Sequence, residues 1–239
     1  MASSSGRDSS AARTLAGVSL KAAADILFPP RCPGCHRRGT WLCAACARVT
    51  PFVEAPRCPR CGDPMSLGCR CDDLPVSLDR LRSALWYEGW VPTAIQWFKY
   101  EGESARASFF AGYLTEELAD LLPVDALVAV PLHRRRERSR GYNQSAALAR
   151  ELGRRSGIAT ARPLARERNT PRQVGLHASE RAENIAGAFT IRPGVDPRGQ
   201  RILLVDDVVT TGSTLGECAA VLKRAGAAWV GALTVARER

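Results

Sequence analysis

The sequence predicts an α/β domain built on a parallel sheet, preceded by a small cysteine-rich module. Segments with strand and helix patterns alternate from about residue 82 onward, as they do in parallel sheets. Eight of the nine cysteines fall between Cys32 and Cys71. A length of 239 residues leaves room for one full-sized domain and a small module. We therefore expect a polar tail and a helix over residues 1–29, the cysteine module over 30–75 and the α/β domain over 80–239.

The composition excludes a largely disordered chain and points to an excess of positive charge. Hydrophobic residues make up 45% of the chain and charged residues 24%, which are ordinary values for globular proteins. Lys and Arg number 34 against 24 Asp and Glu, giving a net charge of +10, and only three of the 34 are lysines (Lys21, Lys99 and Lys223). Guanidinium groups favour bidentate contacts with phosphate or carboxylate. An anionic partner is one explanation of this surplus, and genomic base composition is the other.

Residues 11–28 predict a helix that ends at Pro29, because apolar residues recur there at helical spacing. A packing helix is favoured over a membrane-surface helix. Lys21 and Asp25 interrupt the segment and no cleavage site follows, so it does not read as a secretory signal. No run reaches the roughly 18 apolar residues of a membrane span. We expect a cytoplasmic protein, with a peripheral position at the inner face of the membrane as a second possibility.

The spacing of the cysteines predicts metal sites. In the cytoplasm, clustered cysteines bind metal more often than they form disulfides. Eight thiolates are enough for two four-sulfur zinc sites, and they come from three Cys-x-x-Cys pairs and one Cys-x-Cys pair: Cys32 and Cys35, Cys43 and Cys46, Cys58 and Cys61, Cys69 and Cys71. Sequential pairing fits a double zinc ribbon, and interleaved pairing stays open. We expect one or two structural zinc ions. For the module, a purely structural role and docking of nucleic acid or protein are the two alternatives.

The α/β domain is predicted element by element from about residue 80. The apolar run at 126–131 indicates a buried parallel strand, and RILLVDD at 201–207 is the strongest strand signal. Asn143 suits the N-cap of the helix that follows it, and Gly226 suits the end of the last helix. Cys218 falls on the apolar face of that helix and is expected in the core. The expected strands are 81–88, 126–131, 201–207 and 228–236, and the expected helices are 91–113 (in pieces), 114–121, 143–156 and 213–225.

The most informative motif is RILLVDDVVTTGSTL at 201–215. It brings two acids to the carboxyl end of a central strand, where open α/β sheets bind ligands, and the turn and helix N-terminus that follow form an anion site. A strand followed by a capped helix, with solvated acids, is the alternative. The string resembles the 5-phosphoribosyl-1-pyrophosphate (PRPP) motif of the type I phosphoribosyltransferases. That resemblance implies that the catalytic acids Asp206 and Asp207 contact the ribose hydroxyls, and that the 5-phosphate lies on Thr210, Thr211, Gly212, Ser213 and Thr214.

A transferase of this type must also bind the pyrophosphate leaving group. Residues 132–140 carry five arginines against one acid, in a loop that the strand at 126–131 delivers to the same edge of the sheet. A solvated arginine loop is the alternative. The expected pyrophosphate-binding residues are Leu132, His133, Arg134, Arg138 and Arg140. Residues 162–184 form a polar stretch with little periodicity, and residues 166–189 have the composition of a mobile lid. The expected flexible-loop residues are Arg168, Thr170, Gln173, His177 and Arg181.

Together these motifs resemble the ComF/GntX family of phosphoribosyltransferase-like proteins over about residues 25–239. The resemblance rests on the cysteine pairs and, in this order, on FKYEGE, VPLHRRRERSRGYNQS, RNTPRQVGLHASERAENIAGAF and VDDVVTTGST. It implies a type I phosphoribosyltransferase-like parallel sheet with helices on both faces and a small N-terminal zinc-ribbon module. For the competence branch it also implies a role in natural transformation. The Cys69-x-Cys71 spacing departs from the family's Cys-x-x-Cys, so one of these two cysteines is expected to be a poorer ligand.

Two functions fit this resemblance. The first is an enzyme that binds Mg-PRPP, with Mg2+ as its cofactor, and transfers phosphoribosyl to a nitrogen acceptor held by residues from about 90–113. The second is a non-catalytic PRPP sensor that binds single-stranded DNA on its arginine-rich surfaces, with competence-machinery proteins as further partners. Purine-salvage relatives carry a carboxylate at the position of Thr210, so threonine there disfavours a purine-salvage reaction and leans toward the sensor.

Overall fold

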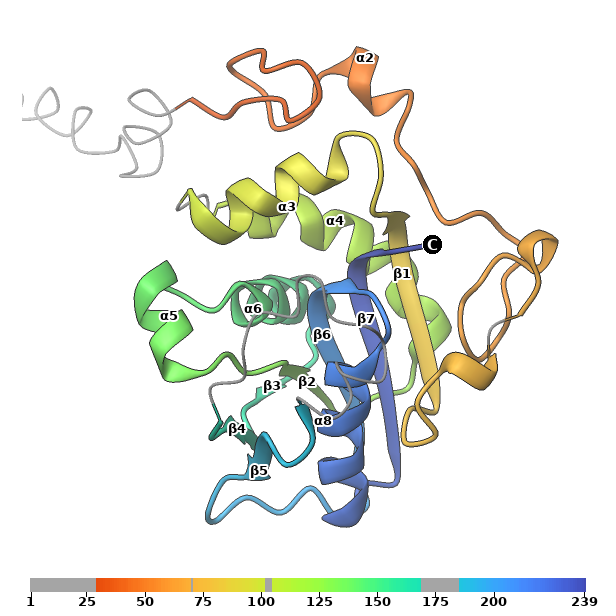
Figure 1. Cartoon of the computed structure of the whole chain (residues 1–239), viewed down its shortest axis with the longest axis vertical. Coiled ribbons are helices and arrows are strands. Elements are labelled where there is room, and N and C mark those ends of the chain that lie inside the picture. The colour runs from red at the N-terminus through yellow and green to blue at the C-terminus, as the bar shows by residue number, and fades with distance from the viewer. Residues whose placement is uncertain (1–28, 70, 102–104, 169–184) are drawn as a thin grey trace, which may run out of the picture.

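The computed structural model describes residues 29–69, 71–101, 105–168 and 185–239, which form an α/β domain with two cysteine-containing lobes beside it (Figure 1). The helix predicted over residues 11–28 lies outside the described residues.

A five-stranded parallel sheet, in the order β1-β7-β6-β2-β3, forms the centre of the domain. The strands are β1 (Arg80–Trp86), β2 (Ala126–Ala129), β3 (Thr160–Ala161), β6 (Arg201–Val209) and β7 (Trp229–Arg237). The predicted parallel sheet is therefore confirmed. Strands β6 and β7 are buried along most of their length, which explains their nearly continuous apolar sequence. Since all five strands run the same way, their carboxyl ends meet at one edge.

Helices cover both faces of the sheet, as the sequence predicts. On one face, Leu203 and Val205 of β6 belong to a buried cluster with α3 (Val91–Tyr100), α4 (Arg106–Leu118) and α6 (Gln144–Ser156). On the other face, Ile202 and Leu204 belong to a cluster with α8 (Ser213–Arg224). The buried thiol of Cys218 lies in the second cluster, where the sequence places it. Alternate residues of one strand thus serve two separate cores.

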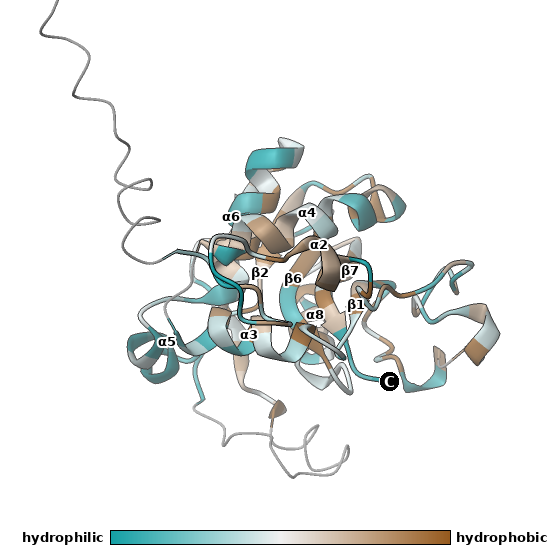
Figure 2. Cartoon of the chain, turned by 90° about the horizontal axis from the view of Figure 1, so that it is seen from above, coloured by the Kyte–Doolittle hydropathy of each residue, from teal (hydrophilic) through white to brown (hydrophobic). Residues whose placement is uncertain are grey.

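Two helical segments differ from the sequence expectation. The helix predicted to begin near residue 114 is the second half of α4, which continues without a break to Leu118 and is followed by the 3-10 turn η3 (Ala119–Leu121). Residues 132–140, predicted as a loop, contain the helix α5 (Arg134–Arg140). His133 caps α5, since its ring nitrogen accepts a hydrogen bond from the backbone N–H of Arg135, and Gly141 ends it in the left-handed conformation. Figure 2 shows α5 as hydrophilic, which is why apolar periodicity does not reveal it.

A small antiparallel pair flanks the sheet. It consists of β4 (Leu164–Arg166), near the start of the long polar segment, and β5 (Phe189–Ile191), which follows that segment. β4 lies within the polar stretch in which the sequence predicts no strand. Residues 169–184 between them lie outside the described part of the chain.

The two cysteine lobes pack on different parts of the domain. The first lobe (residues 30–50, with α2, Ala44–Ala47) lies over α3 and α4 in Figure 1. Here the buried guanidinium of Arg106 lies 4.7 Å from the ring of Trp41 and 5.3 Å from that of Trp97, and it donates to the carbonyl of Arg31. These contacts fix the first lobe to α3 and α4.

The second lobe comprises residues 56–78 apart from residue 70, with the 3-10 turns η1 (Met65–Leu67) and η2 (Cys71–Asp73), and lies beside β1. Arg237, at the end of β7, donates to the carbonyl of Cys61 at 2.8 Å and pairs with the buried Asp63 at 2.7 Å. The carboxyl end of the sheet is therefore tied to the second lobe by a buried ion pair.

Candidate metal centres and anion-binding pocket

The cysteines form two tetrads in sequential order, one in each lobe. The four sulfurs of Cys32, Cys35, Cys43 and Cys46 lie within 4.8 Å of one another, and so do those of Cys58, Cys61, Cys69 and Cys71. The interleaved pairing that the sequence left open is therefore wrong, because each lobe brings only its own cysteines together.

The sulfur spacing fits tetrahedral zinc. Sulfurs bound to one zinc ion at about 2.3 Å lie about 3.8 Å apart. The separations are 3.6 Å between Cys35 and Cys43 and 3.7 Å between Cys61 and Cys69, and Cys58 lies 3.4 Å from both Cys69 and Cys71. Cys69 and Cys71 lie 2.9 Å apart, and both belong to the second tetrad. Both thiols of the Cys-x-Cys pair therefore belong to one tetrad with the thiols of Cys58 and Cys61.

The protonation of the thiols also suits a cation. Burial opposes ionisation of Cys32, but backbone N–H groups around it outweigh burial and lower its pKa to about 6. The same balance lowers the pKa of Cys58 to about 6. The hydrogen bond with Cys43 raises the pKa of Cys46 to about 12, because a second negative charge in the tetrad is unfavourable. A divalent ion among the sulfurs removes that repulsion, so the donor sets fit structural zinc.

The turn between β6 and α8 has the features of an anion site. Gly212 is the N-cap of α8 with a φ of 74°, and it offers no side chain to the amides of the first helical turn. The capped-helix alternative, with Ser213 or Thr214 as the cap, is therefore not what the structure has. The hydroxyls of Thr211 and Ser213 lie 2.7 Å apart at the same turn. Amides, hydroxyls and the helix N-terminus converge on one point, which favours a bound anion.

The two acids at the end of β6 have different surroundings. Asp206 lines the pocket beside this turn, and its carboxylate accepts hydrogen bonds from the hydroxyl of Ser145 at 2.7 Å and from the backbone N–H of Asp207 at 2.9 Å. Burial, followed by the charge of Asp207, raises the pKa of Asp206 to about 7. Asp207 is 4% exposed and is absent from the pocket lining.

Lys99, on α3, is the cation that accompanies Asp207. The two charged groups lie 3.0 Å apart. Burial disfavours the charged form of Lys99, but the Asp207 carboxylate outweighs burial and raises the pKa of the lysine. The second carboxylate oxygen of Asp207 is buried and has no hydrogen-bond partner among the described residues. Lys99 itself lines the pocket, whereas of the two acids only Asp206 does so.

The pocket has a volume of about 510 Å³ and combines the turn with four cationic side chains. Its lining includes residues 210–214, Asp206, and the side chains of Lys99, Arg136, Arg140 and Arg166. Burial, followed by the nearby charge of Arg136, lowers the pKa of Arg166. Cations crowded in this way are stabilised by an anion of more than one charge.

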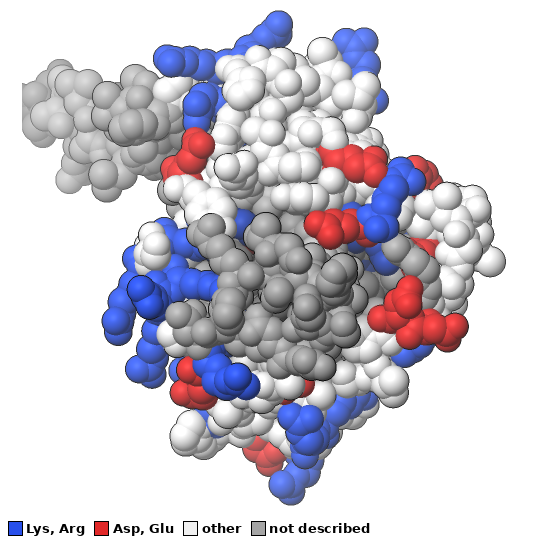
Figure 3. Space-filling view, in the orientation of Figure 1, with Lys and Arg blue, Asp and Glu red and all other residues white. Residues whose placement is uncertain are grey.

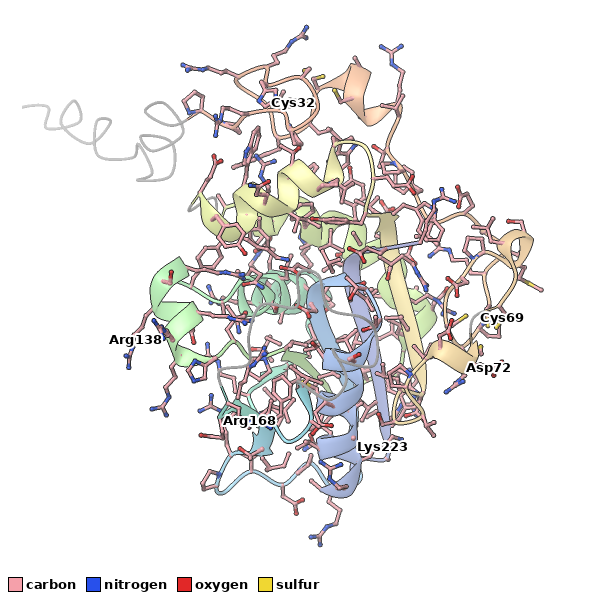
Figure 4. The ribbon with its side chains drawn as sticks, in the orientation of Figure 1. Cys32, Cys69, Asp72, Arg138, Arg168 and Lys223 are labelled. Carbon is pink, nitrogen blue, oxygen red and sulfur yellow. The ribbon has the colours of Figure 1, made fainter. Side chains whose placement is uncertain are left out.

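The predicted pyrophosphate residues lie on different sides of α5. Arg140 lines the pocket, where it donates to Gln144 at 2.9 Å and to the hydroxyl of Tyr100 at 3.0 Å. Arg134 and Arg138 are exposed, and Figure 4 shows Arg138 pointing away from the sheet. His133 caps the helix, and Leu132 precedes it without lining the pocket. Because the segment is helical, only the face of Arg136, Ser139 and Arg140 can reach the ligand space.

The predicted flexible-loop residues are mostly outside the described part of the chain. Arg168 is described, and it donates to the carbonyl of Ala186 at 2.8 Å. Thr170, Gln173, His177 and Arg181 fall in 169–184 and are not described.

Several pocket residues were not predicted, because they come from distant parts of the sequence. They are Tyr87, Lys99, Tyr100 and Glu238 in the lining, together with Ser145, which holds Asp206. Lys99 and Tyr100 lie in FKYEGE, and Ser145 ends VPLHRRRERSRGYNQS, so the motifs that carry the resemblance could have indicated these three. Tyr87 and Glu238 carry no sequence signal of their own.

In the part of the chain that the structure describes, no helix has both the length and the apolar content needed to cross a lipid bilayer.

Comparison with known proteins gives a family model at each end of the chain. Residues 23–74 match the double zinc ribbon domain, and residues 138–239 match the phosphoribosyl transferase domain. DNA utilization protein YhgH of Salmonella typhi is 36% identical over 200 residues, which cover 79% of this chain and 87% of that protein. Competence protein F of Haemophilus influenzae is 29% identical over 215 residues, which cover 83% of this chain and 93% of that protein.

Among solved structures, the glutamine PRPP amidotransferase of B. subtilis aligns with a TM-score of 0.38 and 23% identity. The alignment covers 55% of this chain and 26% of the amidotransferase.

Proposed function

We propose that this chain, which belongs to the ComF family of phosphoribosyltransferase-like proteins, binds Mg-PRPP in the 510 Å³ pocket and transfers its phosphoribosyl group to a nitrogen acceptor. The observation that carries the proposal is the meeting of an anion-binding turn, a hydrogen-bonded carboxylate and four cationic side chains in one cavity at the carboxyl edge of the sheet.

Each part of the pocket has a role in this proposal. The turn at 210–214 binds the 5-phosphate through its amides and hydroxyls. Asp206 accepts hydrogen bonds from the ribose hydroxyls, and Asp207, held by Lys99, supports Asp206 through its backbone N–H. Arg136, Arg140 and Arg166 face the pyrophosphate. These cations stabilise the negative charge that grows on the pyrophosphate as it leaves.

The reaction exchanges one bond at C1 of the ribose for another. The bond from C1 to the pyrophosphate oxygen breaks, the bond from C1 to the acceptor nitrogen forms, and the acceptor loses a proton. Mg2+, bound to PRPP, supplies further neutralisation of the departing charge. Besides Asp206, the carboxylate in the described lining is Glu238, whose backbone N–H donates to the carbonyl of Val209 beside the turn at 3.0 Å. We assign the acceptor's proton to Glu238, since Thr210 is not a base at neutral pH.

Calorimetric titration tests the binding of Mg-PRPP, which both an enzyme and a non-catalytic sensor require. We expect wild type to bind, Asp206→Asn to bind at least tenfold more weakly because a charge-assisted hydrogen bond is lost, and Glu238→Gln to bind as wild type does. Equal binding by wild type and Asp206→Asn, or no binding by either, contradicts the proposal. Release of pyrophosphate in the presence of nucleobases or amines then separates turnover from binding alone.

A second candidate function is a PRPP sensor that binds single-stranded DNA without turnover. The observation that favours it is the outward side of α5, where Arg134, Arg135 and Arg138 are exposed and where Figure 3 shows positive side chains gathered. The names of the relatives, DNA utilization protein and competence protein, support a role of this chain in DNA uptake.

The salt dependence of DNA binding tests this candidate. Binding through these arginines should weaken steeply as salt rises, and replacing Arg134, Arg135 and Arg138 by alanine should reduce the slope. Affinity for an oligonucleotide that is insensitive to salt excludes this surface as a track for the phosphate backbone.

A further inference from the structure

The phosphate-binding turn is in contact with the second cysteine lobe on the side away from α5. A cavity of about 760 Å³ on that side is lined both by residues 209–213 and by Leu74, Pro75 and Ser77 of the second lobe. The turn therefore separates two spaces, one that holds the proposed ligand and one bounded by the lobe.

Pro75 packs against the two glycines at the start of α8. A Cβ atom added to Gly216 would lie 2.5 Å from the Cβ and 2.6 Å from the Cγ of Pro75, and one added to Gly212 would lie 3.3 Å from the Cδ. Distances below 3.0 Å cannot be tolerated, and a proline ring has no flexible end that can move aside. Glycine at position 216 thus permits the backbone of α8 and the ring of Pro75 to be in direct contact.

Two further contacts hold the same segment in place. The hydroxyl of Ser77 donates to the carbonyl of Gly216 at 2.7 Å. Leu74 and Leu78 are buried in the cluster that contains Leu215 and Cys218 of α8. Residue 74 directly follows η2, which begins at the zinc-site cysteine Cys71. The chain that leaves the second tetrad is therefore packed on the first turn of α8 within four residues.

We propose that Pro75 and Ser77 are positioning residues for the 5-phosphate site, so that the second cysteine lobe is part of the ligand-binding apparatus. They fix the first turn of α8, whose amides must point at one place to bind a phosphate. The inference rests on the proposed PRPP function of the pocket and adds to it a contribution from the cysteine module.

Gly216→Ala gives the decisive test, because the melting temperature and ligand binding together distinguish a glycine that contacts Pro75 from one that is merely a weak helix residue. Alanine favours a helix interior over glycine, so without the contact to Pro75 the substitution raises the melting temperature and leaves binding unchanged. If Pro75 braces the turn, the added methyl group pushes Pro75 and the first turn of α8 apart. Binding of ribose 5-phosphate should then weaken on the order of tenfold. The matched control is Gly112→Ala in α4, where an added Cβ meets nothing within 4 Å. Ribose 5-phosphate affinity equal to that of wild type in Gly216→Ala overturns the inference.

Ser77 provides a second test with a conservative rescue. Ser77→Ala should weaken binding of ribose 5-phosphate, and Ser77→Thr, which keeps the hydroxyl, should restore it, while the zinc content of both stays as in wild type. Equal weakening by both variants contradicts a role for the hydrogen bond to Gly216.

Hydrogen exchange separates failure of this inference from failure of the proposed function. The amides of residues 210–216 should exchange faster in Gly216→Ala and Ser77→Ala than in wild type, with no ligand present. If wild type binds neither ribose 5-phosphate nor Mg-PRPP, the proposed function fails, and exchange still shows whether the lobe braces the turn. Unchanged exchange in both variants overturns the bracing itself.

Discussion

Asp206 and Asp207 are neighbours in sequence that face different environments. The carboxylate of Asp206 lines the pocket and accepts a hydrogen bond from Ser145 of α6. The carboxylate of Asp207 pairs with Lys99 of α3. The resemblance between motifs assigns both acids to one task, whereas in the structure Asp206 lines the pocket and Asp207 is held in the ion pair with Lys99.

Stability should depend on pH through Asp206. Its pKa is raised from 3.8 to about 7, so the folded state keeps a proton that the unfolded state has lost between these values. The free energy of unfolding of wild type should therefore fall relative to Asp206→Asn as pH rises from about 4 to about 7, by up to about 1.4 kcal/mol per pH unit. Urea denaturation of both proteins at pH 5 and pH 7 measures this change. A difference that grows in favour of wild type as pH rises contradicts the raised pKa.

Removing Lys99 should destabilise the fold through the carboxylate that it leaves behind. Lys99→Met leaves Asp207 buried without its cation, and we expect a loss of about 2 to 3 kcal/mol in the free energy of unfolding, below the range for fully buried pairs because Lys99 is 22% exposed. The double variant Lys99→Met with Asp207→Asn should recover part of the loss. Equal losses in the single and double variants, measured by urea denaturation, would show that the ion pair is not the cause.

At the scale of elements, α5 determines which arginines face the pocket. The segment 134–140 has no apolar face, so its helix is stabilised by the cap at His133, by Gly141 and by contacts such as that of Arg140 with Tyr100. Residues three and four apart share a side of a helix, which separates Arg136 and Arg140 from Arg138.

Substitutions on the two sides of α5 should therefore differ in effect. Arg140→Ala should weaken binding of Mg-PRPP by about tenfold or more, because a charged contact to the pyrophosphate is lost, while binding of ribose 5-phosphate, which has no pyrophosphate, stays near that of wild type. Arg138→Ala is the matched control and should affect neither ligand. Calorimetric titration distinguishes the cases, and similar effects of both substitutions would contradict the orientation of the helix.

At the scale of the whole molecule, the two cysteine lobes hold opposite parts of the α/β domain. The first lobe is fixed to α3 and α4 by Arg106, and the second is fixed to β7 by Arg237 and to α8 by Pro75 and Ser77. The cysteine module is therefore packed against α3 and α4 through its first lobe and against β7 and α8 through its second. It is not a separate unit on a linker.

Zinc removal should therefore destabilise the whole chain and not the lobes alone. Two zinc ions per chain are expected from the two tetrads, and Cys32→Ser or Cys69→Ser should each reduce the content to one. A strong chelator should lower the melting temperature of the α/β domain, since metal binding contributes to the folding of the lobes. Zinc analysis and calorimetry measure both effects. A content of two ions in Cys69→Ser would show that Cys69 is not needed as a ligand.

The sequence by itself determined the parallel sheet, the main strands, the Asn143 cap and the composition of the turn at 210–214, because these depend on local patterns. Apolar runs mark strands that are buried on both faces, and glycine with hydroxyl residues marks the turn. The family resemblance likewise rests on short motifs that can be recognised in order.

Only the tertiary structure decided which residues share the pocket and which cysteines share a tetrad. Lys99, Ser145 and Glu238 meet the turn from three distant segments, and nothing in their own neighbourhoods encodes that meeting. The helix at 134–140 was not predicted because none of its residues is buried, and a helical repeat of apolar residues appears only where one face of a helix is buried. The spacing within each cysteine pair is a local feature, so the sequence identifies the metal ligands. Which two pairs form one tetrad depends on how each lobe folds back on itself, so only the tertiary structure decides it.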